Sequence, residues 1–174
     1  MKKLLLFLAF LVSTTTYSQT ILTNNNFQDA INTCLSTNPV DWLCSSSEYG
    51  IMPEWDVSNV TDMSWMFRDA SKFNQDLSAW NTSGVETMRG MFWGASQFNQ
   101  DLSAWNVSAV KNMQCMFYGA AAFDGNISLW NTSAVTNMGY MFFRASSFNP
   151  EDLSNWDTSQ VIYMNSMFLE ASLF

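Results

Sequence analysis

The sequence predicts an α/β repeat solenoid, a leucine-rich-repeat-like arc of about five strand–helix coils with an N-terminal helical cap. The nine residues FNQDLSAWN occur at 73–81 and again at 98–106. Tryptophans recur with a period of 25 residues, and within each period the apolar spacing changes from that of a strand to that of a helix. We expect parallel strands on the concave side and helices on the convex side, because strands stack at about 4.8 Å and helices at about 10 Å.

The period is kept by several columns of residues. Trp55, Trp80, Trp105 and Trp130 are each 25 residues apart, and Trp156 follows after 26 because one residue is inserted near 150–151. Met-Phe pairs recur in the same phase at 66–67, 91–92, 116–117, 141–142 and 167–168. About two thirds of the chain is therefore one unit used five times, and each copy is expected to bury its apolar side chains against the next.

One repeat illustrates the expected elements. Apolar and β-branched residues near 103–107 predict a short strand. Val110, Met113, Phe117 and Ala120 follow at helical spacing and predict a helix, with a serine ahead of it as the N-cap. The tryptophans are expected to pack inside, and the asparagines Asn74, Asn99 and Asn149 to satisfy backbone groups at a corner, with Asp124 in the same role.

The N-terminus divides into two predicted segments. Residues 1–18 have two lysines, an apolar run and small polar residues, which predicts a secretory signal peptide cleaved after Ser18. Residues 19–50 are expected to form the helical cap, with a helix from Asn26 whose buried face is Phe27, Ala30, Ile31 and Cys34. Residues 51–174 form the repeat array, which looks truncated at its C-terminus. Its uncapped last coil exposes Val161, Met164, Phe168 and Phe174, so we expect self-association through this end.

Composition bounds the partners and the chemistry. The chain has 15 acidic and 7 basic residues, no histidine, and a net charge of −8. Nucleic acids and anionic membranes need basic residues, so neither is expected as a partner, and no later segment is long enough to span a membrane. Without histidine, and with like residues in ladders, the chain is not expected to be an enzyme or to hold a cofactor or metal.

The three cysteines fall into two groups. Cys34 and Cys44 could close a short loop by a disulfide in an oxidising compartment. Cys115 occupies a variable column and is expected to point outward. It is either an accidental free thiol or a site of intermolecular pairing.

The best binding candidate is a polar strip on the predicted concave face. It comprises one Asx residue per coil and the serine two positions later: Asp56, Asn81, Asn106, Asn131, Asp157, with Ser58, Ser83, Ser108, Ser133 and Ser159. The strip could bind an extended polypeptide or a glycan on another cell or matrix surface. Alternatively, these side chains only satisfy the backbone of turns.

The repeat unit L-S-x-W-[ND]-[VT]-S-x-V-x-x-M-x-x-M-F-x-x-A-x-x-F-N resembles that of the BspA-family leucine-rich repeat surface proteins of bacteria, a group with many mycoplasmal lipoproteins. The resemblance covers about residues 27–174. It implies a secreted or cell-surface protein-interaction or adhesion module. The alternative is a structural component of the cell envelope or extracellular matrix with no discrete ligand.

Overall fold

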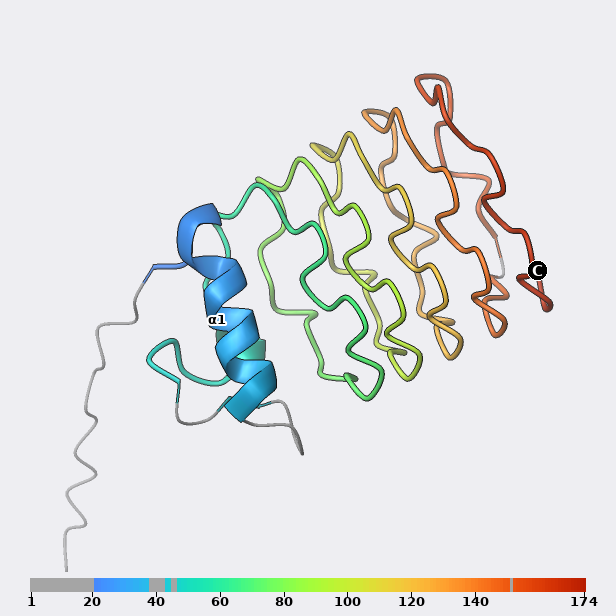
Figure 1. The fold of residues 1–174 in the computed structure, drawn as a ribbon. Helices are drawn as coiled ribbons and strands as arrows, with labels where there is room; N and C mark the ends of the chain where they lie inside the picture. The colour runs from blue at the N-terminus through green and yellow to red at the C-terminus, as the bar shows by residue number, and fades with distance from the viewer. Residues whose placement is uncertain (1–20, 38–42, 45–46, 151) are drawn as a thin grey trace, which may run out of the picture.

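The computed structural model describes residues 21–37, 43–44, 47–150 and 152–174. These residues form a row of stacked coils with one α-helix lying across its first end, and the C-terminus lies at the other end (Figure 1). The helix, α1, spans Asn24–Thr37, and a short 3-10 helix, η1, spans Met52–Glu54. In the part of the chain that the structure describes, no helix has the length and hydropathy needed to span a bilayer. The predicted signal peptide lies outside the described residues.

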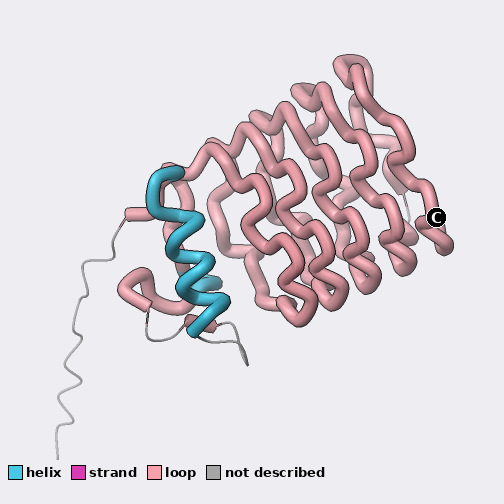
Figure 2. The backbone as a smooth tube through the Cα atoms, in the orientation of Figure 1, coloured by secondary structure: helices cyan, strands magenta, loops and turns pink. Residues whose placement is uncertain are grey.

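The predicted α/β repeat solenoid is wrong. From residue 55 onward the described chain consists of turns and bends, without helices or strands (Figure 2). Strand-like pairing among the described residues is limited to isolated parallel bridges, one between Thr23 and Asn59 and the others linking Asp62, Thr87, Asn112, Asn137 and Tyr163 in sequence. The bridges from Asp62 onward lie within the segments predicted as helices, as Asn112 does between Val110 and Met113, whereas the predicted strands around the tryptophans have none. The described coils therefore lack both the predicted concave sheet and the predicted convex helices.

Left-handed residues explain why no helix forms in the coils. Each coil has two residues with positive φ, four positions apart, at 65 and 69, 90 and 94, 115 and 119, 140 and 144, and 166 and 170. A left-handed residue cannot continue a right-handed helix. The chain instead makes successive tight turns, such as those closed by Met91 N–H to Met88 and by Ala95 N–H to Phe92. Successive turns place apolar side chains on one side at a spacing that resembles that of a helix.

Backbone hydrogen bonds alternate between the coil and its neighbour. The N–H groups at 88, 90, 92 and 94 donate to carbonyl oxygens of the next coil at 112, 114, 116 and 118, over 2.8 to 2.9 Å. The intervening N–H groups at 91, 93 and 95 donate within their own turns. Inter-coil bonds of the same kind recur at 63–69, 113–119 and 138–144. The coils thus satisfy their buried peptide groups without regular secondary structure.

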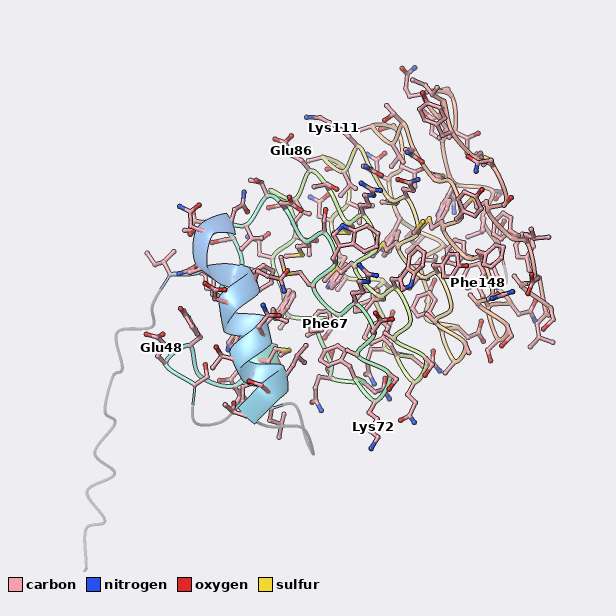
Figure 3. The ribbon with its side chains drawn as sticks, in the orientation of Figure 1. Glu48, Phe67, Lys72, Glu86, Lys111 and Phe148 are labelled. Atoms are coloured by element: carbon pink, nitrogen blue, oxygen red, sulfur yellow. A yellow bond between two sulfur atoms is a disulfide. The ribbon has the colours of Figure 1, made fainter. Side chains whose placement is uncertain are left out.

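Two columns of phenylalanine rings form the centre of the core, in which Phe67 and Phe148 are labelled in Figure 3. The two rings of one coil stack with centroids 3.8 to 4.0 Å apart, as in the pair Phe67 and Phe73. Rings of successive coils stack at 5.4 to 5.6 Å in the first column and at 5.9 to 6.2 Å in the second. Each repeated ring therefore packs on its counterparts in the adjacent coils.

The first four tryptophans of the 25-residue period are buried, as the sequence predicted, Trp156 is partly buried, and the tryptophans from Trp80 to Trp156 also link the coils. Trp55, Trp80, Trp105 and Trp130 are only 2 to 3% exposed. The indole Nε1 of Trp80 donates to the carbonyl of Met52, and Trp105 Nε1 donates to Leu77, over 3.0 and 2.9 Å. Trp130 and Trp156 repeat this bond to Leu102 and Ile127. On this side of the coil, side chains supply inter-coil hydrogen bonds.

Helix α1 covers the first coil, and its predicted buried face of Phe27, Ala30, Ile31 and Cys34 is confirmed. The Phe27 ring meets Trp80 edge-on with centroids 5.6 Å apart. A disulfide joins Cys34, near the end of α1, to Cys44. The helix is therefore attached to the array by apolar packing and, at its C-terminal end, by a covalent link to the segment that leads into the array.

The last coil exposes several apolar side chains: Ile162, Tyr163, Met164, Leu169, Leu173 and Phe174, each 42 to 71% exposed. Self-association through this surface stays a prediction.

Candidate functional site

The Asx residues of the predicted polar strip, one in each coil, are exposed, and we call this row of residues with its serines the Asx strip. Each of these side chains accepts a hydrogen bond through Oδ1 from the backbone N–H of the serine two residues later. The distances are 3.0 Å at Asp56, 3.2 Å at Asn81, 3.0 Å at Asn106, 3.2 Å at Asn131 and 2.9 Å at Asp157. The strip is thus a row of Asx turns, in which one oxygen of each residue is used by the chain itself.

The serines of the strip serve the same turns. The hydroxyls of Ser83 and Ser133 donate to Asn81 and Asn131 Oδ1 over 2.7 and 2.8 Å. Hydrogen bonds from the Ser58 hydroxyl and N–H lower the pKa of Asp56, and those from Ser159 lower the pKa of Asp157. The predicted helix-capping role of these serines is wrong, because no helix follows them. The geometry matches the alternative that the strip satisfies turn backbones, and ligand binding there stays a prediction.

The corner residues form a ladder of side chains. Asn74 Oδ1 accepts the N–H of Asn99, Asn99 Oδ1 accepts that of Asp124, and Asp124 Oδ1 accepts that of Asn149, over 2.8 to 2.9 Å. The predicted structural role is confirmed for Asn74, Asn99 and Asp124, and it stays a prediction for Asn149. Their bonds connect successive coils.

Cys115 is buried, and the prediction that it points outward is wrong. Burial raises the pKa of its thiol, so the reactive thiolate is disfavoured.

Within the described ranges, no three or more Asp, Glu or Cys side chains are grouped so that they could hold a metal ion.

A row of partly exposed aromatic rings lies outside the core. We call Trp65, Trp93, Tyr118, Tyr140 and Phe143 the outer aromatic stripe. Trp93 and Tyr118 stack with centroids 3.9 Å apart and planes 2° from parallel, and Tyr118 stacks on Phe143 at 4.6 Å. The stripe therefore runs from coil to coil along the stack.

Arginine side chains border the outer aromatic stripe. The guanidinium carbons of Arg68 and Arg89 lie 5.4 and 5.2 Å from the Trp65 ring centroid, and that of Arg144 lies 5.1 Å from the Phe143 ring. These distances are typical of cation–π contacts. Arg144 also forms an ion pair with Glu170 at 2.8 Å, whereas Arg68 pairs with Asp69 at 3.4 Å.

The repeat pattern is that of a known family. The model of the family described as "Mycoplasma protein of unknown function, DUF285" matches residues 44–128 and 103–174. The chain belongs to this family. No curated protein and no solved structure matches the chain.

In this DUF285 chain, sequence reasoning missed the outer aromatic stripe. The position after each Met-Phe pair reads Arg68, Trp93, Tyr118, Phe143 and Leu169. The signal that could have identified Trp93, Tyr118 and Phe143 is three aromatic residues of different type at one position, within a repeat whose core residues are nearly constant. A binding surface is free to vary in this way, whereas a packed core is not.

Proposed function

We propose that the chain is a secreted or cell-surface protein-interaction module that binds an extended polypeptide through the outer aromatic stripe. The observation that carries this proposal is the stacked row of Trp93, Tyr118 and Phe143, partly exposed and bordered at Phe143 by Arg144. Tryptophan, tyrosine and arginine dominate the binding energy of protein interfaces. Rings locked by stacking also lose little conformational entropy when a partner binds.

The stacking favours a polypeptide over a glycan. Sugars bind to the free faces of aromatic rings, but both faces of Tyr118 are covered, by Trp93 on one side and by Phe143 on the other. The rings are only partly exposed, and apolar side chains of a protein partner can cover the apolar surface that remains.

The location outside the cell is part of the proposal. It is supported by the predicted signal peptide of residues 1–18 and by the resemblance of the repeat to that of BspA-family surface proteins. We propose no catalytic activity and no cofactor. The alternative function is a structural component of the cell envelope or matrix, in which the stripe would have no discrete ligand.

A double variant tests the proposed function. The chain is applied to an array of extracellular matrix proteins and glycans, next to Trp93→Ser/Tyr118→Ser. We expect binding to at least one protein, weakened about 30-fold or more in the double variant because two interface aromatic residues are lost. Leu129→Ser is the matched control, since Leu129 is 72% exposed and lies outside the stripe. Equal binding by all three chains, or binding to glycans alone, would refute the proposal. Thermal unfolding of each variant verifies that its fold is intact.

A further inference from the structure

We propose that the polypeptide bound by the stripe carries an acidic side chain, which is recognised by Arg68 and Arg89, both in contact with Trp65. We call these three residues the arginine clamp. This inference rests on the proposed function and adds the chemistry of the partner.

The indole of the arginine clamp is held in place by the neighbouring coil. Gly90 lies directly against it, because a Cβ built on Gly90 would come within 2.1 Å of the Trp65 ring. Gly90 also has a φ of 58°, which favours glycine. Trp65 itself has a φ of 64°. Both backbone conformations therefore direct the ring over the next coil, where it can contact Arg89.

The two guanidinium groups contribute positive charge to an otherwise acidic chain. Arg68 and Arg89 both contact Trp65, whereas the chain as a whole has a net charge of −8. Arg68 has the exposed carboxylate of Asp69 beside it. No ion pair among the described residues involves Arg89. A guanidinium in a cation–π contact can still donate two parallel hydrogen bonds to a carboxylate.

The clamp is continuous with the outer aromatic stripe. Trp65 and Trp93 have ring centroids 5.8 Å apart, and Trp93 stacks directly on Tyr118. A segment with a carboxylate at the clamp would therefore place its next side chains over Trp93 and Tyr118. Those side chains should be apolar, because they would cover the exposed apolar surface of the two rings. The expected ligand is thus a short extended segment with aspartate or glutamate next to apolar residues.

A library of random 12-residue peptides displayed on phage tests this inference. The immobilised chain is used for selection, and enriched peptides are synthesised together with twins in which Asp and Glu are replaced by Asn and Gln. We expect enrichment of acidic residues next to apolar ones, and about tenfold weaker binding of the neutral twin, which is the order expected for one charge-assisted pair. Arg89→Gln should lose the same factor for the acidic peptide and nothing for its neutral twin.

The control is Lys72→Gln, which removes the same charge from a side chain that points outward at the lower edge of Figure 3. Raising the salt concentration should weaken the wild-type complex with the acidic peptide and leave that with the neutral twin unchanged. Peptides that depend on Trp93 and Tyr118 but show no acidic preference would overturn the arginine clamp and leave the proposed function intact. If no peptide is enriched, or if heparin alone binds in an Arg89-dependent way, the proposed polypeptide partner is itself overturned.

Discussion

At the residue scale, the coils depend on left-handed conformations at ordinary amino acids. In the repeat array these are Trp65, Asp69, Cys115, Tyr140, Arg144, Ser166 and Glu170, while glycines occupy the equivalent positions 90, 94 and 119. A left-handed conformation costs an L-residue about 1 to 2 kcal/mol. Each one is flanked by inter-coil hydrogen bonds, such as those from Cys115 and Phe117 to Gly139 and Met141. These bonds hold the turns in place and offset the conformational cost.

Substitutions at Gly119 and Gly125 distinguish two causes of lost stability, an unfavourable backbone conformation and a steric clash of the added Cβ. Gly119 has a φ of 66°, and an added Cβ would come no closer than 3.9 Å to another atom. Gly119→Ala should therefore lower the free energy of unfolding by about 1 kcal/mol. A Cβ on Gly125 would lie 2.4 Å from the Gln100 carbonyl oxygen, so Gly125→Ala should cost more, about 2 to 3 kcal/mol.

Urea denaturation measures both changes. Gly119→Asn is the matched control, since asparagine tolerates the left-handed region better than alanine does, and it should be closer to the wild type. If Gly119→Ala were as harmful as Gly125→Ala, backbone conformation alone could not explain the preference for glycine at 119.

At the scale of elements, helix α1 lies where a preceding coil would otherwise pack against the first coil. In the inner coils, the N–H groups of Glu86 and Thr87 donate to the Thr61 carbonyl of the preceding coil. In the first coil, Asn24 Oδ1 takes the place of that carbonyl and accepts the N–H groups of Thr61 and Asp62 over 2.8 and 3.1 Å. The Asn24 amide nitrogen also donates to the Thr61 hydroxyl over 2.7 Å. One side chain at the start of α1 thus caps the open edge.

Removing this cap should loosen the first coil without unfolding the array. Asn24→Ala leaves the two N–H groups to bond with water, at a cost of about 1 kcal/mol, as for the loss of a helix cap. We expect the amide hydrogens of Thr61 and Asp62 to exchange about fivefold faster with solvent, and those of the coils that contain residues 113–119 and 138–144 to exchange at an unchanged rate. Asn24→Asp keeps the acceptor and is the control. Unchanged exchange at both amides in Asn24→Ala would show that the side chain does not cap the coil.

Helix α1 was predictable from the sequence, whereas the turns of the coils were not. The face of α1 was predictable, because Phe27, Ala30, Ile31 and Cys34 belong to a continuous helix. The spacing of Val110, Met113, Phe117 and Ala120 predicted a helix for the same reason, yet turns with left-handed residues at 115 and 119 give the same spacing. Cys115 does not signal such a conformation, and the helix prediction failed there. In the Asx strip, the pairing of Asx with a serine two residues later allowed both the binding and the turn interpretation, and only coordinates show the hydrogen bonds.

At the scale of the whole molecule, one coil is held to the next by different means on its two sides. Peptide groups connect the coils along 63–69, 88–94, 113–119 and 138–144. Single peptide bonds outside these segments, such as Gln97 N–H to Ser71 and Lys111 N–H to Glu86, also connect the coils. On the tryptophan side the connections come from side chains: the indoles, the corner ladder from Asn74 to Asn149, and the hydroxyl of Thr82, which donates to the Asn106 carbonyl over 3.0 Å. Exposed ion pairs such as Lys111 with Glu86, seen side by side at the upper edge of Figure 3, span adjacent coils but contribute little. Stability therefore depends on Asx and threonine side chains that are repeated throughout the array.

Because several of the Asx residues that close turns within the coils are aspartates, the stability of the whole array should fall in acid. Hydrogen bonds from the following serine lower the pKa of Asp56, Asp76, Asp152 and Asp157 in the folded chain. Near and below pH 4 the unfolded chain then binds more protons than the folded chain. The stabilisation by these hydrogen bonds is therefore fully present above the ordinary aspartate pKa of about 3.9. It is lost as the pH falls through the lower pKa values of the folded chain. The urea midpoint should accordingly be flat between pH 5 and 7 as far as these groups are concerned, and should fall between about pH 4 and 2.

Asp56→Asn/Asp157→Asn tests whether these carboxylates are responsible for the loss in acid. The same column has asparagine at 81, 106 and 131, where the amide oxygen accepts the same serine N–H. The double variant should therefore match the wild type at pH 6 and lose less stability at pH 3, because an amide does not titrate. An acid dependence as steep as that of the wild type would assign the effect to other carboxylates. A large loss at pH 6 would instead show that the negative charge, and not only the acceptor oxygen, holds these turns.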